Sequence, residues 1–171
     1  MDERQRILSQ VPGLERIDTA VLSALSHLFD LKEYKGATLC QQGQDADQLW
    51  ILGSGSLSVI RTTETGHPCE VAQLEPTCLV GFSGLVGIQH RSASLHAMGD
   101  VQVLEMSTLA AQRILDTSDS PVASAFRRAV IVAVSRQMAL SNRNIARLAV
   151  EVGVAEPVLS EEQLLRTTTL F

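Results

Sequence analysis

The sequence has few aromatic and few charged residues, and its charge is not basic. Phe, Trp and Tyr make up 4% of the 171 residues, and Asp, Glu, Lys and Arg together make up 19%. The formal net charge is -5 and the isoelectric point is near 5.3. Because binding to phosphates requires a basic face, this balance argues against nucleic acid as a partner of the whole chain.

Cysteines and long apolar runs are also scarce. The three cysteines, Cys40, Cys69 and Cys78, contain no C-x-x-C pair, which indicates free thiols in a reducing compartment and neither a disulfide framework nor a zinc knuckle. No apolar run approaches the ~18 residues of a membrane span. The charged start, Met1 to Arg6, is not followed by the apolar segment of a secretion signal. We expect a cytoplasmic protein that does not enter a membrane.

Apolar residues are nevertheless abundant, at 45%, so the chain can bury a sizeable core in one main domain with an appended element. Residues 3–30 show helical spacing, broken by the turn pair Pro12-Gly13, with Asp18 as an N-cap. From residue 31 to 106, short apolar runs alternate with turn residues, and Thr63–Gly66 is typical of a hairpin loop. The runs lie at Ala37–Cys40, Gln48–Leu52, Ser56–Ile60, Glu70–Leu74, Cys78–Val80, Ser92–Ala97 and Val101–Met106. About seven or eight strands at such short intervals predict an antiparallel sandwich or barrel.

Helical spacing returns after Ser107, which is placed to cap a short helix. Residues Val122–Val150 contain neither proline nor glycine and predict a helix of roughly 29 residues, or ~43 Å. Apolar residues recur along it at heptad-like intervals, at Phe126, Val130, Ala133 or Val134, Met138, Ser141, Ile145 and Leu148. This stripe predicts a homodimer through the helix; the alternative is that the helix packs wholly on its own domain.

The segment Gly81–Ser94 combines three glycines with one arginine, Arg91, in neutral and mostly apolar surroundings. Backbone N–H groups of a tight turn and a planar guanidinium together suit an anion. The plainer interpretation is a glycine loop with a surface arginine, and spacing alone favours it.

Two enzymatic interpretations fit poorly. Gly81-x-Ser83 begins the esterase pattern G-x-S-x-G, but Leu85 stands where the second glycine belongs. A β-barrel metalloenzyme would need clustered histidines, and no H-x-H pair occurs among His27, His67, His90 and His96. We therefore expect no enzyme activity and no metal site, and we assign Trp50 to the core.

Taken in order, these segments resemble the cyclic-nucleotide-binding domain of the catabolite-activator and FNR type of bacterial regulators. The residues that carry the resemblance are Gln42-Gly43, Asp47, Leu49–Leu52, Ser54-Gly55, Leu57, Val59, Gly66, Gly81 and Arg91–Ser94. The resemblance implies a mainly β fold, an eight-stranded double-stranded β-helix (jelly roll) with flanking helices and a long C-terminal dimerisation helix. The implied division is residues 1–120 for the N-terminal helices and β-roll, 121–152 for the dimerisation helix and 153–171 for a tail.

The resemblance also assigns Gly81–Ser94 as a phosphate-binding cassette. Gly81 falls on the glycine that opens a short helix there, and Arg91 on the arginine that clamps the cyclic phosphate. The implied ligand is cyclic AMP or cyclic GMP, with Ser141 and Asn142 facing the purine. The whole implied set is Gly81, Phe82, Ser83, Gly84, Leu85, Arg91, Ser92, Ala93, Ser141 and Asn142.

Two departures from the family pattern matter. Phe82 replaces the glutamate that accepts from the ribose 2′-hydroxyl, a bond of about 1.5–3 kcal/mol, so binding should weaken by one to two decades. Phe82 would either fill the ribose space or turn away into the core. Only about twenty residues follow the long helix, so we expect no helix-turn-helix and no DNA binding by this chain alone. The resulting prediction is a dimeric sensor of a cyclic nucleotide or related anion; the alternative is a ligand-free scaffold for dimerisation or protein docking.

Overall fold

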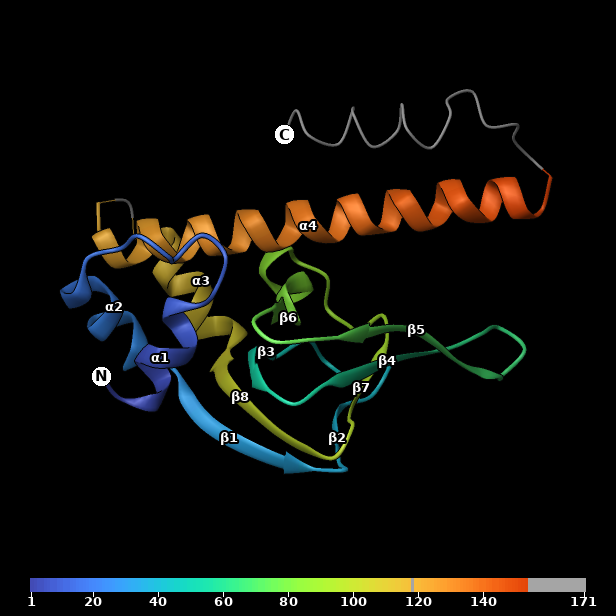
Figure 1. The fold of residues 1–171 in the computed structure, drawn as a ribbon, viewed down its shortest axis with the longest axis horizontal. Coiled ribbons are helices and arrows are strands. Elements are labelled where there is room, and N and C mark those ends of the chain that lie inside the picture. Colours follow the sequence, from blue (N-terminus) through green and yellow to red (C-terminus); the bar gives the residue numbers. More distant parts are fainter. Residues whose placement is uncertain (118, 154–171) are drawn as a thin grey trace. The chain divides into compact units, whose positions relative to one another are not determined.

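The computed structural model describes residues 1–117 and 119–153, and its centre is a β-roll of two four-stranded antiparallel sheets (Figure 1). The strand order is β1-β8-β3-β6 in one sheet and β2-β7-β4-β5 in the other. The strands are β1 (Asp30–Lys35), β2 (Thr38–Cys40), β3 (Gln48–Ser54), β4 (Leu57–Thr62), β5 (Pro68–Leu74), β6 (Leu79–Val80), β7 (Ser94–Ala97) and β8 (Asp100–Ser107). This arrangement confirms the predicted jelly roll with flanking helices.

The first strand, β1, is where the sequence prediction was wrong. Helical structure over 3–30 was expected, but the helices are only α1 (Glu3–Ser9) and α2 (Thr19–Ser26), and β1 begins at Asp30. It pairs with β8 at the edge of its sheet, and only Tyr34 among its residues is partly buried. Charged side chains protect a sheet edge from further pairing, and they also remove the polar–apolar alternation by which a strand is recognised.

Two predicted caps are present. The Asp18 side chain accepts from the Ala20 N–H at 2.7 Å at the start of α2. The Ser107 hydroxyl accepts from the Ala110 N–H at 3.2 Å at the start of α3 (Thr108–Asp116). Each satisfies a backbone donor that the first helical turn leaves without an intrahelical partner.

Removal of the second cap should have a small, measurable effect. Ser107→Ala is expected to lower the free energy of unfolding by about 1 kcal/mol, because an N–H of the first turn of α3 loses its acceptor. Urea unfolding followed by circular dichroism measures this change. Ser124→Ala, at an exposed position inside a helix, should leave stability unchanged or slightly higher. Equal losses in both variants would contradict the role of the cap.

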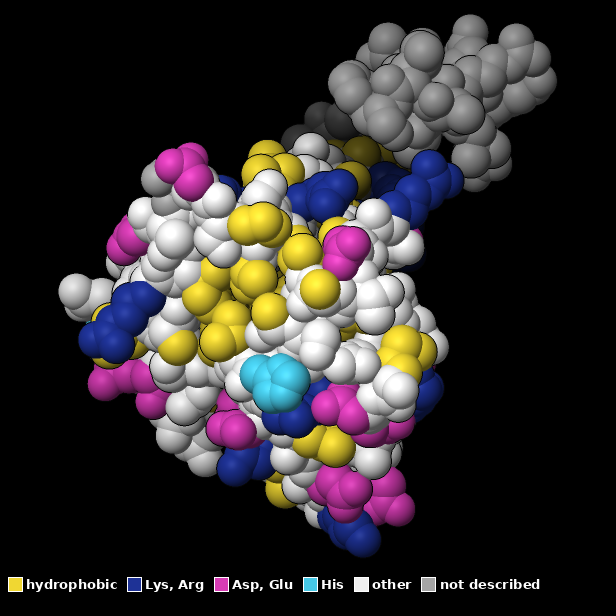
Figure 2. Space-filling view, turned by 90° about the vertical axis from the view of Figure 1, so that its left-hand side faces the viewer, with side chains coloured by type: hydrophobic (Ala, Val, Ile, Leu, Met, Phe, Trp, Pro, Cys, Tyr) yellow, Lys and Arg dark blue, Asp and Glu magenta, His cyan; other side chains and the backbone are white. Residues whose placement is uncertain are grey.

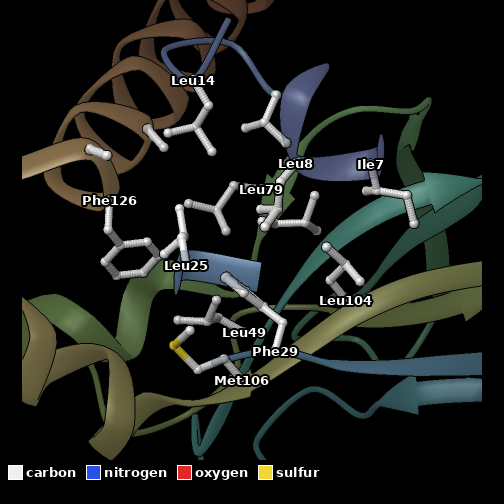
Figure 3. Packing of buried hydrophobic residues seen from close by; sticks show 14 of the residues in the cluster. Ile7, Leu8, Leu14, Leu25, Phe29, Leu49, Leu79, Leu104, Met106 and Phe126 are labelled. Carbon is white, nitrogen blue, oxygen red and sulfur yellow. The ribbon is translucent and has the colours of Figure 1, made fainter. Parts of the chain in front are cut away.

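The larger core cluster joins the N-terminal helices, the start of α4 (Pro121–Glu151) and one face of the β-roll (Figure 3). Phe29 and Phe126 meet edge to face with ring centroids 6.4 Å apart. Their neighbours include Ile7, Leu8, Leu14, Leu25, Leu49, Leu79, Leu104 and Met106. This cluster fixes the strands that carry the cassette against the helices.

The smaller cluster fills the inside of the roll. Its buried members are Cys40, Trp50, Leu52, Leu57, Val80, Leu95, Ala97, Val101 and Val103. Trp50 is 2% exposed, which confirms its assignment to the core. Because β3 alternates its side chains between two faces, neighbouring residues such as Trp50 and Ile51 belong to different clusters.

The long helix was predicted at Val122–Val150 and spans Pro121–Glu151. The chain divides into two compact units, Met1–Ala133 and Val134–Phe171, so the division falls inside this helix. In the first unit, Phe126, Val130 and Ala133 pack on the domain's own core. In the second unit, Met138, Ile145 and Leu148 are exposed. The boundaries drawn at 120 and 152 stay predictions, and the calls on the tail from residue 154 onward lie outside the described residues. Over the described ranges, no helix is long and apolar enough to cross a membrane.

Candidate functional site

The cassette begins where β6 ends. Gly81 follows Val80 with φ 78° and opens a short 3₁₀ helix, Phe82–Val86. A Cβ on Gly81 would lie 2.9 Å from Arg91 Nη1 and 3.1 Å from the Gln48 carbonyl oxygen. Both the left-handed backbone and the close neighbours therefore require glycine here.

Arg91 lies ten residues beyond Gly81, and the fold brings the two together. Its side chain is 3% exposed. Nη1 donates to the Gly81 carbonyl at 3.1 Å, and Nη2 donates to the Gln48 carbonyl. The guanidinium carbon lies 4.7 Å from the centroid of the Trp50 ring, within the range of a cation–π contact. The plainer sequence interpretation, a surface arginine on a glycine loop, is therefore wrong.

One of the three guanidinium nitrogens of Arg91 has no partner. Its Nε is buried and has no hydrogen-bond partner, the one such side-chain atom within residues 1–117 and 119–153. The nearest carboxylate oxygen, Asp47 Oδ1, lies 3.9 Å from Nη2 on a largely exposed side chain. Burial lowers the pKa of Arg91 from its ordinary value, but an arginine remains charged at neutral pH. The result is a buried guanidinium with more N–H donors than the protein around it supplies acceptors.

A cavity of about 380 Å³ lies beside the Trp50 ring, a volume in the range of small-molecule sites. Its lining residues are Leu39, Cys40, Gln44, Asp45, Asp47, Gln48 and Trp50. Burial raises the pKa of Cys40, so its thiol is neutral at pH 7. Asp45 forms an ion pair of 3.3 Å with His90 once that histidine is protonated. The cavity wall thus carries two carboxylates, and the buried Arg91 guanidinium lies behind it, 3.9 Å from the Asp47 carboxylate.

Helix α3 holds the cassette against the loop before β3. The Thr108 hydroxyl donates to the Ala46 carbonyl at 2.7 Å, and Gln112 Nε2 donates to the Gly84 carbonyl at 3.2 Å. A Cβ on Gly84 would lie 2.4 Å from the Ala46 oxygen, so the 3₁₀ helix touches the loop before β3 backbone to backbone. These contacts hold the cassette in place beside the loop that carries Asp45 and Asp47.

The other implied cassette residues take different environments. Phe82 and Leu85 pack against the larger cluster shared with the helices, and neither packs against the cluster inside the roll. Of the two alternatives for Phe82, this is the turn into the core. Ser83 and Ala93 are half-buried, and Ser92 is exposed. The remaining pair, Ser141 and Asn142, is exposed on α4 in the second unit, and a role in binding a purine stays a prediction.

Sequence reasoning did not assign Gln48 or Trp50 to the site. Gln48 contributes only its backbone carbonyl to Arg91, so its side-chain type carries no signal of the contact. Trp50 was assigned to the core from its apolar run. An aromatic residue and an arginine 41 positions apart become neighbours because the backbone of Arg91 is hydrogen-bonded to Gly43 and Gln44, in the loop before β3.

The surface offers no support for a nucleic-acid interface on the face that carries α1 and α2. Figure 2 shows apolar side chains gathered at the centre of this face, with Lys or Arg and Asp or Glu side chains interspersed around them. Phosphate tracking requires a continuous basic stripe, which this face lacks.

A model of the cyclic nucleotide-binding domain family matches residues 32–118, just over half of the chain. The chain belongs to the cyclic nucleotide-binding domain family. The match contains the β-roll from the middle of β1 onward, the cassette and the arginine whose geometry is described above. The predicted resemblance to this family is thereby confirmed.

Solved structures share the fold of this cyclic nucleotide-binding domain. The c-di-GMP-responsive regulator CLP of Xanthomonas campestris has a TM-score of 0.67 and 23% identity, covering 77% of this chain and 65% of that chain. The catabolite activator protein of Thermus thermophilus has a TM-score of 0.67 and 19% identity, covering 81% and 63%. A cyclic nucleotide-binding domain of Methylobacillus flagellatus has a TM-score of 0.74 and 14% identity, covering 92% and 85%. The chain spans less than two thirds of the length of either regulator.

Proposed function

We propose that the protein is a non-enzymatic, dimeric regulatory domain that binds a cyclic nucleotide or a related singly charged anion at Arg91. The observation that carries this proposal is the buried Nε–H of Arg91, which has no acceptor. A buried donor without a partner costs about 1–3 kcal/mol, and more for a charged group. A phosphate oxygen is an acceptor that would remove this cost and neutralise the guanidinium.

The charges around the cavity select among anions. Asp45 and Asp47 line it, so a second negative charge on the ligand would be repelled at short range. A cyclic phosphodiester carries one charge, whereas a phosphomonoester carries close to two at pH 7.5. The domain should therefore prefer cyclic AMP to 5′-AMP.

Titration calorimetry with cyclic AMP and cyclic GMP tests the proposal. We expect saturable binding of at least one of the two, at micromolar to millimolar concentration, and weaker binding of 5′-AMP than of cyclic AMP. The affinity is expected to be modest because Phe82, turned into the core, supplies no carboxylate for a ribose hydroxyl. Absence of binding for both at millimolar concentration would favour the alternative, a ligand-free scaffold for dimerisation or protein docking.

The dimer part of the proposal rests on the apolar side chains of α4. Ile131, Met138 and Ile145 follow one another at intervals of seven and are each more than half exposed. A period of seven keeps one stripe facing a partner helix in a left-handed coiled coil. The partner that this stripe fits is α4 of a second copy.

A charge inside this stripe should separate the two copies. Met138→Glu is expected to raise the dimer dissociation constant about tenfold or more, because two carboxylates would face each other in an apolar seam. Sedimentation equilibrium at several concentrations measures the shift. Leu140→Glu is the matched control, since Leu140 is similarly exposed but lies off the stripe. If the two variants dissociate equally, the stripe is not the seam.

A further inference from the structure

Trp50 is the only tryptophan of the chain, and polar contacts fix its ring inside the roll. It lies opposite Glu105 in the pairing of β3 with β8, and its indole Nε1 donates to Glu105 Oε2 at 2.8 Å. The Tyr34 hydroxyl donates to the same carboxylate oxygen at 3.1 Å. Two donors on one oxygen hold the carboxylate, and the carboxylate holds the indole in one orientation.

The Arg91 guanidinium lies over this ring, 4.7 Å from its centroid. A Cβ on Gly81 would lie 3.1 Å from Trp50 Cε3, so the cassette backbone also rests directly on the ring. The two carbonyls that bind the Nη atoms belong to Gln48, two residues before Trp50 in β3, and to Gly81, which follows Val80, the residue paired with Trp50. The ring, the cassette and the guanidinium thus form one packed layer.

We propose that Trp50, oriented by Glu105, is the positioning residue that holds Arg91 ready for its anion. The two carbonyls leave the guanidinium free to tilt about the axis that joins them, and the flat ring beneath removes this freedom. A donor fixed in advance does not lose conformational entropy when the ligand arrives. A cation–π contact is also strongest where water is excluded, as it is here. This inference rests on the anion site proposed above.

Affinity measurements distinguish positioning from plain core packing. Trp50→Leu fills much of the space but has no π face, and we expect it to weaken cyclic AMP binding about tenfold. Trp50→Phe keeps a π face and should recover most of this loss, to within about threefold of the natural protein. Glu105→Gln, which retains an acceptor oxygen for the indole N–H, should bind within about twofold, whereas Glu105→Leu should bind several-fold more weakly.

Ile51→Val is the control for lost packing. Ile51 adjoins Trp50 in β3 but points into the other core cluster, so its truncation should lower the melting temperature without changing affinity. Equal affinity losses in Trp50→Leu and Trp50→Phe, or no loss in either, would overturn the positioning role.

A second readout needs no ligand and remains decisive if no cyclic nucleotide binds. Protons above an aromatic face are shifted upfield, so the Arg91 Nε–H resonance of the free protein should lie upfield of the ordinary arginine position. The shift should persist in Trp50→Phe and vanish in Trp50→Leu. An ordinary resonance position in the natural protein would overturn the inference. A shifted resonance without ligand binding would support the stacking of Arg91 on Trp50 and would count against the proposed anion function alone.

Discussion

Replacing Arg91 by glutamine should weaken cyclic AMP binding by about 100-fold or more. A phosphate that loses two charge-assisted hydrogen bonds loses about 1.5–3 kcal/mol for each, and a factor of 100 corresponds to about 2.7 kcal/mol. Glutamine is shorter, uncharged and carries a single amide nitrogen, so it cannot reproduce the two contacts of the guanidinium with the carbonyls of Gly81 and Gln48. The loss would therefore combine the missing charge with the missing fork. Titration calorimetry at fixed ionic strength measures the two dissociation constants for cyclic AMP.

Two further arginine variants sharpen this experiment. Arg91→Lys keeps a point charge but not the planar fork, and about tenfold weaker binding is expected. Arg61→Ala removes an exposed arginine of β4 outside the cassette and should leave the affinity within twofold. If Arg91→Gln binds as tightly as the natural protein, the anion does not bind at Arg91.

Gly81→Ala should cost about 3 kcal/mol of unfolding free energy. Alanine is strained at φ 78°, and its Cβ would approach Arg91 Nη1, the Gln48 carbonyl oxygen and Trp50 to 2.9–3.1 Å. The guanidinium would have to move off the ring to make room, so anion binding should fall together with stability. At about 2–4 °C per kcal/mol for a chain of this size, the melting temperature should drop by about 6–12 °C.

Gly66→Ala separates backbone strain from crowding. Gly66 has φ 82° in the β4–β5 hairpin, but no atom lies within 4 Å of the Cβ that would be added. Its cost should be near 1 kcal/mol, from the positive φ alone, with no change in affinity. If Gly81→Ala loses no more unfolding free energy than Gly66→Ala, the cassette accommodates the added methyl group around Arg91 without strain.

Much of the fold was predictable from the sequence because turn residues mark the strands so regularly. Glycines at Gly55, Gly66 and Gly81 occupy positions of positive φ, and Ser107 and Asp18 cap helices as their residue types predict. Strand β1 was not predictable, since its charged edge residues lack the alternation of a half-buried strand. The ends of the long helix were predicted to within one residue because neither proline nor glycine interrupts it.

The site was predictable in its sequence-local part only. Gly81 and Arg91 lie close together along the chain, so one segment suggested an anion site, and the family resemblance then assigned both residues to it. The partners that define the chemistry of Arg91 are the Gln48 carbonyl, the Trp50 ring and the carboxylate of Glu105 behind it, and these come from distant strands. The orientation of Phe82 could not be predicted either, because a phenyl ring at that position could fill the ribose space or pack into the core shared with the helices.

The most direct test of the account observes the unpaired donor itself. We expect the side-chain Nε–H resonance of Arg91, followed by ¹⁵N NMR during a titration with cyclic AMP, to move downfield saturably, because a phosphate oxygen becomes the acceptor that this buried donor lacks in the free protein. A resonance that stays in place while other signals of the protein report saturation with cyclic AMP would contradict the assignment of Arg91 as the anion-binding residue.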